Sequence, residues 1–135
     1  MATIQIPLAL GGPMADVSLS VSKNYAPWGG PPGRWRALID TGSDMTTISP
    51  AIVAALQPMR LGAQAVRRPV GGLEWCDTYD VRLRLGRGVH GRWIQLEALE
   101  IQPATTNVDV LIGMDVLLRI DMAWHGPRGL LILSY

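Results

Sequence analysis

The stretch that decides the fold reads Ala37-Leu38-Ile39-Asp40-Thr41-Gly42-Ser43-Asp44. Three apolar residues, typical of a buried strand, lead directly into a carboxylate, a hydroxyl, a glycine and a second hydroxyl. A carboxylate at the end of an apolar strand is costly to bury unless it is hydrogen-bonded or shares a proton. One given four-residue string arises by chance in a chain of this length with odds on the order of one in a thousand. The stretch therefore predicts chemistry at Asp40.

The chain around this stretch has the composition of one all-β domain. Its 135 residues, 48% of them hydrophobic and 17% charged, are enough for one core and too few for two. The 15 glycines and 10 prolines favour many short strands over a few long helices. We therefore expect a single all-β domain over residues 1–135, with one or two short helices.

Charge and cysteine content exclude several classes of function. Lys and Arg number 12 against 11 Asp and Glu, so the net charge of +1 gives no basic field that would favour nucleic acid. No apolar run approaches the roughly 20 residues of a membrane span, and no basic residue precedes the apolar part of residues 1–10, so we expect a cytoplasmic protein. Cys76, the only cysteine, excludes an intrachain disulfide and a cysteine metal cage, and we expect it to be buried and structural.

Apolar periodicity predicts the order of the elements. Alternation over residues 4–8 and 17–21 predicts an N-terminal hairpin. Further strands are predicted at residues 34–40, 64–70, 73–85, 92–101, 108–112, 122–124 and 129–135. Ser49 followed by Pro50 predicts a capped helix through about Leu56, and residues 114–120 suit a second short helix. The four apolar residues 130–133 predict a C-terminal strand that is buried on both faces. Because an exposed apolar edge strand would invite aggregation, we expect the terminal strands of a partner chain to cover it.

Asp40-Thr41-Gly42-Ser43 after Leu38-Ile39 resembles the active-site loop of the aspartic proteases, and the chain as a whole resembles their single-domain retroviral type, the retropepsins. Residues 111–113, with Asp115 and two further leucines, resemble the family's second signature, which packs behind the catalytic loop. Residues 69–73 resemble the tip of the hairpin flap that closes over substrate. The likeness spans residues 34–120. The chain differs in carrying Met114 where retroviral enzymes usually have arginine, and Ser43 where they have alanine.

The resemblance implies an acid protease fold and an aspartic endopeptidase that needs no metal or other cofactor. The family mechanism uses two carboxylates about 3 Å apart, one ionised to take a proton from water and one protonated. With one Asp-Thr-Gly per chain, the active site is expected at a homodimer interface between Asp40 and its symmetry mate. Thr41 would hydrogen-bond across the two-fold axis, and Gly42 would let backbone approach the carboxylates. The hydroxyl of Ser43 is expected to donate to the ionised carboxylate and to favour an acid optimum.

The expected substrate is a peptide or protein held beside the catalytic loop and under the flap. The expected substrate-binding residues are Leu38, Ser43, Asp44, Val70, Gly71, Gly72, Leu73, Trp75 and Leu111. Asp44 either binds a substrate amide or caps the following turn, and Trp75 is either a pocket wall or packing. Asp115 is expected to cap its helix rather than act in catalysis.

Two other interpretations remain open at this point. The Asp-Thr-Gly turn could only cap structure, or the chain could be a catalytically silent dimeric module that keeps the cleft and binds peptides. A site that binds phosphate through a glycine-rich loop is disfavoured, because no lysine follows Gly42. An intact Asp-Thr-Gly argues against the silent module, since a binder needs no proton-sharing pair of carboxylates.

Overall fold

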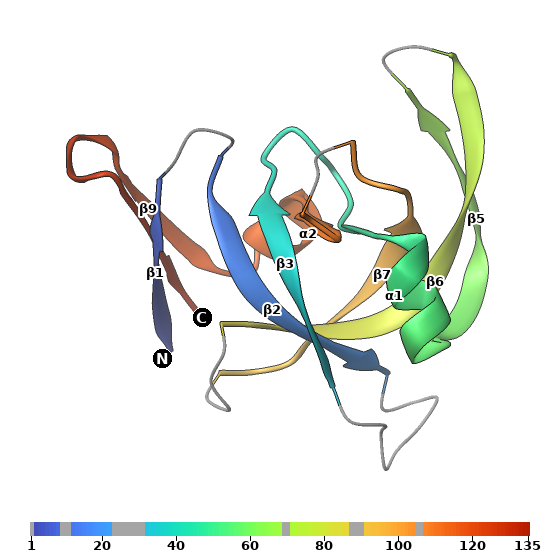
Figure 1. The fold of residues 1–135 in the computed structure, drawn as a ribbon, viewed down its shortest axis with the longest axis horizontal. Helices are drawn as coiled ribbons and strands as arrows, with labels where there is room; N and C mark the ends of the chain where they lie inside the picture. Colours follow the sequence, from blue (N-terminus) through green and yellow to red (C-terminus); the bar gives the residue numbers. More distant parts are fainter. Residues whose placement is uncertain (1, 9–11, 23–31, 69–70, 87–90, 105–106) are drawn as a thin grey trace.

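The strands form a small barrel to which a three-stranded sheet is attached (Figure 1). The computed structural model describes residues 2–8, 12–22, 32–68, 71–86, 91–104 and 107–135. Its strands are β1 (Thr3–Pro7), β2 (Met14–Val21), β3 (Gly33–Ile39), β4 (Thr47–Ile48), β5 (Met59–Arg67), β6 (Leu73–Leu85), β7 (Ile94–Glu100), β8 (Val110–Ile112), β9 (Asp121–His125) and β10 (Leu130–Ser134). Its helices are α1 (Pro50–Leu56), α2 (Met114–Leu117) and the short 3-10 helix η1 (Gly126–Arg128).

The barrel is closed because β2 pairs on both of its sides. The larger sheet has the order β2-β3-β8-β4-β7-β6-β5, and a further pairing of β2 with β6 joins its ends, leaving β5 outside the ring. Alternate residues of the strands in the ring point inward, as the period of two requires. The barrel interior is filled by branched and small apolar side chains, among them Val17, Leu19, Ala37, Ile39, Val81, Leu83, Val110 and Ile112. This filling fixes β3, the strand that leads into Asp40-Thr41-Gly42.

β8 lies between β3 and β4, although it follows both in the chain by more than 60 residues. It runs parallel to β3, with Leu38 opposite Leu111, and antiparallel to β4. The end of β8 is therefore placed beside the end of β3, which brings the two sequence signatures together.

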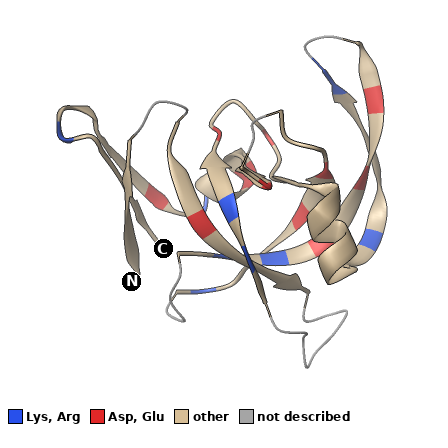
Figure 2. Ribbon diagram, in the orientation of Figure 1, with Lys and Arg blue, Asp and Glu red and all other residues tan. Residues whose placement is uncertain are grey.

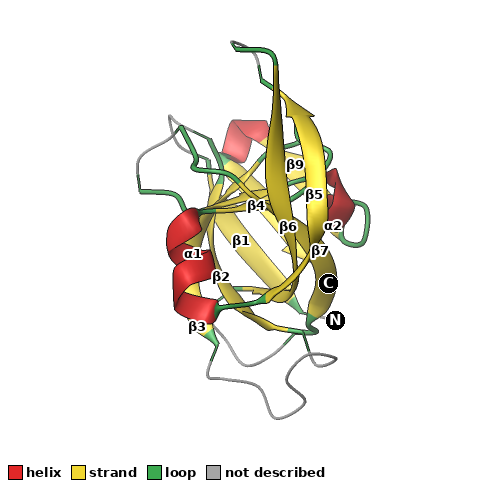
Figure 3. Ribbon diagram, turned by 90° about the vertical axis from the view of Figure 1, so that its right-hand side faces the viewer, coloured by secondary structure: helices red, strands yellow, loops and turns green. Residues whose placement is uncertain are grey.

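The predicted helix after Ser49 is confirmed as α1. The hydroxyl of Ser49 accepts a hydrogen bond from the backbone N–H of Ile52 at 3.4 Å and donates to the carboxylate of Asp109 at 3.1 Å. Pro50 occupies the first turn, where its missing N–H costs nothing. The helix ends at a left-handed Gln57, and α1 and α2 lie outside the strands (Figure 3).

The predicted N-terminal hairpin is wrong. β1 pairs with β10 rather than with β2, and β10 pairs in turn with β9, giving the small sheet β1-β10-β9. Leu131 and Leu133 are fully buried there, with β1 on one side and β9 on the other. The C-terminal strand is thus covered by this chain's own strands, which corrects the expectation that a partner's terminal strands cover it.

Smaller differences concern element lengths. β5 begins five residues earlier than predicted, with a register shift between Arg60 and Gly62, and α2 ends at Leu117 rather than at residue 120. The two-residue β4 is too short to give any periodic signal. No helix within the described ranges is long and apolar enough to span a bilayer.

Candidate active site

Asp40 is the first residue after β3, and its loop is tied to the neighbouring strand. The N–H of Asp40 donates to the carbonyl of Ile112 at 2.9 Å, which continues the pairing of β3 with β8 by one residue. The N–H of Gly42 donates to Oδ1 of Asp40 at 3.0 Å, and the N–H of Ser43 to its carbonyl at 3.3 Å. The half-buried carboxylate is therefore oriented by backbone of its own loop, while Thr41 is exposed.

The hydroxyl of Ser43 does not donate to Asp40. It donates to the backbone carbonyl of Met45 at 2.7 Å, so its one proton is used within the loop. The expected stabilisation of an ionised Asp40 by Ser43 is therefore corrected. In this structure Ser43 holds the shape of the turn that follows Asp40.

The second signature packs directly against the back of this loop. The N–H of Met114 donates to the carbonyl of Ser43 at 2.8 Å, and the N–H of Asp115 to the carbonyl of Asp44 at 3.1 Å. Gly113 makes this approach possible, because a Cβ built there would lie 2.6 Å from the carbonyl carbon of Met45 and 2.9 Å from the oxygen of Ser43. The glycine is required by close approach, since real Cβ contacts are never so short.

Asp115 and Thr46 join the two signatures through side chains. The carboxylate of Asp115 accepts from the N–H of Thr46 at 3.1 Å, from its hydroxyl at 2.7 Å, and from the N–H of Val116 in its own helix at 2.9 Å. The hydroxyl of Thr46 in turn accepts from the N–H of Gly113 at 3.1 Å. The N-cap of α2 is Gly113, and Asp115 lies in the first turn, where it accepts from one N–H of its helix and otherwise binds Thr46. Thr46 is a residue that the sequence interpretation missed.

The hairpin of β5 and β6 rises from the barrel as the candidate flap (Figure 1). At its tip, the N–H of Arg68 donates to the carbonyl of Gly72 at 2.9 Å. Gly71 and Gly72 have φ angles of +102° and +79°, which favour glycine. Val70, expected to contact substrate, lies outside the described residues.

The two faces of the hairpin differ in burial. Leu73 and Trp75 share one face and are 67% and 73% exposed, while Cys76 points to the other face and is buried. At this exposure Trp75 is not packed into the core of the described residues. Burial raises the pKa of the Cys76 thiol, with a smaller contribution from Glu74, as expected for a structural cysteine.

A cavity of about 330 Å³ lies between the loop after β3 and the β5 strand of the candidate flap. The loop contributes four residues to its lining, the first flap strand contributes another four, and β7 contributes one: Gly42, Ser43, Asp44, Met45, Gln64, Ala65, Val66, Arg67 and Leu99. Three expected site residues are thus brought together with β5. Leu38 and Leu111 are neighbours on adjacent strands, yet neither lines this cavity.

The sequence interpretation missed the β5 residues that line this cavity. It expected the substrate-binding residues of the hairpin at its tip and on the returning strand, β6. Residues 64–67 were predicted as a strand, and nothing in their sequence says which edge of the hairpin meets the loop. No group of three or more acidic, histidine or cysteine side chains that could hold a metal ion occurs among the described residues.

Comparison with known proteins supports the fold. No family model matches the chain, and no curated protein matches it. Among solved structures, the chain is similar to the crystal structure of a retropepsin-like aspartic protease from Rickettsia conorii, with a TM-score of 0.62 and 14% sequence identity. The likeness covers 99% of this chain and 91% of the other. The chain therefore has an all-β, retropepsin-like fold, as the sequence predicts.

Proposed function

We propose that this chain, with its retropepsin-like fold, is an aspartic endopeptidase that acts as a homodimer. The observation that carries the proposal is the placement of Asp40: a half-buried carboxylate at the end of an apolar strand, oriented by the N–H of Gly42 and facing solvent beside a hairpin that can cover it. Among the described residues, its hydrogen bonds come from backbone alone, so the carboxylate remains available for proton transfer.

The chemistry requires a second carboxylate, because one group must take a proton from water while another gives a proton to the scissile carbonyl. One chain supplies one Asp-Thr-Gly, so the second would be Asp40 of the partner subunit. Two like charges this close favour a shared proton, and the pair is active while it holds one. Thr41 is exposed in the single chain and would meet the partner's loop in the proposed dimer.

Each remaining part of the site has a role in this mechanism. Gly42 would keep the carboxylate oriented, and the cavity between residues 42–45 and β5 would hold a substrate side chain beside the cut bond. The flap would exclude water once a peptide is bound. Leu38 and Leu111 would contribute apolar surface, so we expect large hydrophobic residues on both sides of the cut bond.

The deciding experiment compares the wild type with Asp40→Asn on denatured casein. The wild type should cleave it with a bell-shaped pH profile whose maximum is acidic, at roughly pH 3 to 5. Asp40→Asn should lose cleavage by a factor of at least about a thousand, because amides cannot share the proton or activate water. Circular dichroism should show the same fold for both proteins.

Two controls accompany this comparison. Asp77→Asn removes a carboxylate from an exposed ion pair with Arg60 at 3.0 Å, and should leave cleavage unchanged. Pepstatin tests whether a statine-type inhibitor is accepted. A wild type that binds peptides and cleaves none at any pH would support the silent binding module instead, and cleavage by Asp40→Asn would rule out the mechanism.

A further inference from the structure

The carboxylate of Asp44, four residues after Asp40, has no partner in the part of the chain that the structure describes. It accepts no hydrogen bond there and enters none of the ion pairs, and the residue is exposed. The backbone carbonyl of Asp44, by contrast, accepts from the N–H of Asp115 at 3.1 Å. Asp44 therefore does not cap the turn after it, and its side chain is left for a ligand.

The cavity of about 330 Å³ between the loop after β3 and β5 has Asp44 in its lining. This volume falls within the range of small ligand pockets, roughly 300–1,000 Å³. Figure 2 shows acidic residues in red on this loop. Gln64 lines the cavity from β5, and its carboxamide makes no hydrogen bond to any described residue. The cavity thus offers an unused carboxylate from the loop and an unused carboxamide from the strand.

The register of the hairpin decides which side chains of β5 face the cavity. Residues directly opposite each other in an antiparallel pair share one face. Gln64 lies opposite the buried Cys76, and we call the face that carries these two residues the inner face. Arg67 lies opposite Leu73, which is 67% exposed, so its side chain belongs to the outer face. Arg67 therefore does not neutralise Asp44, and no ion pair joins them among the described residues.

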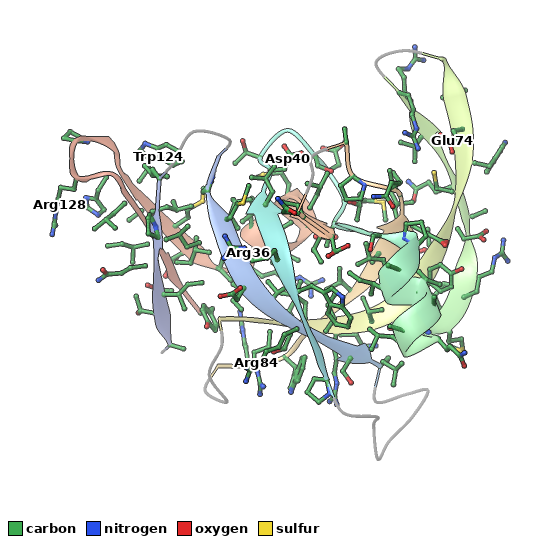
Figure 4. All side chains as sticks on the ribbon, in the orientation of Figure 1. Arg36, Asp40, Glu74, Arg84, Trp124 and Arg128 are labelled. Carbon is green, nitrogen blue, oxygen red and sulfur yellow. The ribbon has the colours of Figure 1, made fainter. Side chains whose placement is uncertain are left out.

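The other charges of the inner face balance each other. Glu74 lies on that face because it is two positions from Cys76 on the same strand. Its Oε2 lies 2.5 Å from Nε of Arg68, so the two residues add no net charge. In Figure 4, Asp40 lies on the loop after β3 and Glu74 on the hairpin that rises beside it. The charge that Asp44 gives to the cavity is therefore left uncompensated.

We propose that this cavity is a specificity pocket for a basic side chain, lysine or arginine, of the substrate; the proposal rests on the proposed peptidase function. Asp44 would accept a charge-assisted hydrogen bond from the head group, and Oε1 of Gln64 would accept a second. The apolar residues of the lining, Met45, Val66 and Leu99, would contact the aliphatic stem. An acidic side chain would be repelled by Asp44.

The basic residue would lie further along the peptide than the two residues that flank the cut bond. Leu38 and Leu111, which we expect to contact apolar side chains beside that bond, do not line this cavity. A pocket at a fixed place in the cleft selects one position of the peptide. That property distinguishes it from a general attraction of cationic peptides to an acidic site, which would act at every position alike.

The test uses octapeptides of alanine with a central Leu-Leu pair and one variable residue, placed at each other position in turn. The variable residue is lysine, norleucine or glutamate. At one position, kcat/KM of the wild type should be at least roughly tenfold higher for lysine than for norleucine, mainly through a lower KM, and lowest for glutamate. No position with this preference, or a preference for glutamate, would overturn the proposal.

Variants of the two polar residues test the pocket directly. Asp44→Asn keeps the shape of the side chain and should bring the lysine-to-norleucine ratio of kcat/KM to within about twofold of one. Gln64→Glu adds a second negative charge and should raise the ratio several-fold. The matched control Asp77→Asn removes a carboxylate from the outer face of the same hairpin and should leave the ratio unchanged. If Asp44→Asn lowered both rates together at a constant ratio, Asp44 would have only a structural role and the proposal would fail.

Binding without cleavage separates this proposal from the peptidase function. Fluorescein-labelled octapeptides are titrated with Asp40→Asn and followed by anisotropy. The lysine peptide should bind at least roughly fivefold more tightly than the norleucine peptide, and the double variant Asp40→Asn/Asp44→Asn should remove the difference. This result with a wild type that cleaves nothing would refute the peptidase alone and leave the pocket standing. Equal binding of the two peptides at every position would overturn the pocket and leave the peptidase standing.

Discussion

Gly113 shows how one residue fixes the catalytic loop. Its missing Cβ lets the backbone of residues 43–45 come within van der Waals distance, and the N–H of Met114 then reaches the carbonyl of Ser43. Gly113→Ala should therefore lower the free energy of unfolding by about 1–3 kcal/mol, since backbone on both sides must move. Because the displaced atoms belong to the proposed active-site loop, the rate of cleavage should fall even at temperatures where the variant remains folded. Chemical denaturation and casein assays measure both.

The matched control for that substitution is Gly126→Ala. The nearest atom to its Cβ would be 3.4 Å away on Trp124, an ordinary contact, and the residue lies far from the loop. Its stability should change by less than about 0.5 kcal/mol. If Gly113→Ala were as stable and active as this control, the close packing of the two signatures would be incorrect.

Thr46 and Thr47 are adjacent, both buried, and predicted to respond oppositely. Thr46→Val removes the acceptor of the Gly113 N–H and a donor to Asp115, so it should cost about 1–3 kcal/mol. The hydroxyl of Thr47 has no partner among the described residues, and Thr47→Val should be neutral or slightly stabilising. Thermal and urea unfolding of the two variants side by side measures the difference. A larger loss at Thr47 would contradict the hydrogen bonds described.

The residues of the site differ in how far the sequence determines them. Asp40 and Gly113 follow from short motifs, because a loop that tight tolerates few residue types. Ser43 belongs to the same loop as Asp40, but its hydroxyl points to Met45, because a rotamer is set by the finished loop rather than by the motif. Thr46 acquires its role from Asp115, 69 residues later, which no local pattern reveals.

The β5–β6 hairpin is the candidate flap, and its proposed motion depends on its backbone. Gly72 has a φ of +79° and nothing within 4 Å of a built Cβ, so a side chain there is strained by backbone conformation and not by a clash. Gly72→Val should lower turnover several-fold under conditions in which the protein stays folded. Its free energy of unfolding should fall by only about 1–3 kcal/mol. Steady-state kinetics and denaturation give the two values.

The control on the same hairpin is Gly62→Ala. It has no positive φ, and its built Cβ would lie 3.9 Å from the nearest atom, the hydroxyl of Thr78. Turnover should therefore change less than twofold. Unchanged turnover in Gly72→Val would remove the assignment of this hairpin as a flap.

Helices and strands were predicted well where the signal lies in neighbouring residues of the sequence. The pairing of strands was predicted poorly, because it depends on residues far away in the chain. The cap at Ser49 defines α1 within a few residues, and it is confirmed. Period-two alternation correctly identified β1 and β2 as strands, but it states only that one face is buried and not which strand lies alongside. β1 instead joins β10, where Ile6 packs with the buried residues Leu131 and Leu133.

At the scale of the whole molecule, the chain holds half of the proposed active site, and one edge of β9 has no strand beside it in the part of the chain that the structure describes. β9 is the last strand of the small sheet, and four of its five residues are exposed. Trp124 and Met122, 61% and 43% exposed, lie opposite the buried Leu131 and Leu133. An apolar edge strand in this state invites pairing with another strand. A second copy would cover it and would also bring a second Asp40.

Trp124→Glu should therefore weaken the dimer while leaving the fold of the chain intact, because a charge on an edge strand opposes pairing. Specific activity of the wild type should rise with enzyme concentration and then level off, and the variant should need at least roughly tenfold more enzyme to reach the same level. Leu61→Glu, at a residue that is 47% exposed on β5, is the matched control and should follow the wild-type curve.

Sedimentation velocity at the assay concentrations should show monomers where activity is lost. A fully active monomer would exclude the shared site altogether, whereas a dimer unaffected by Trp124→Glu would move the interface away from β9 and leave the shared site standing.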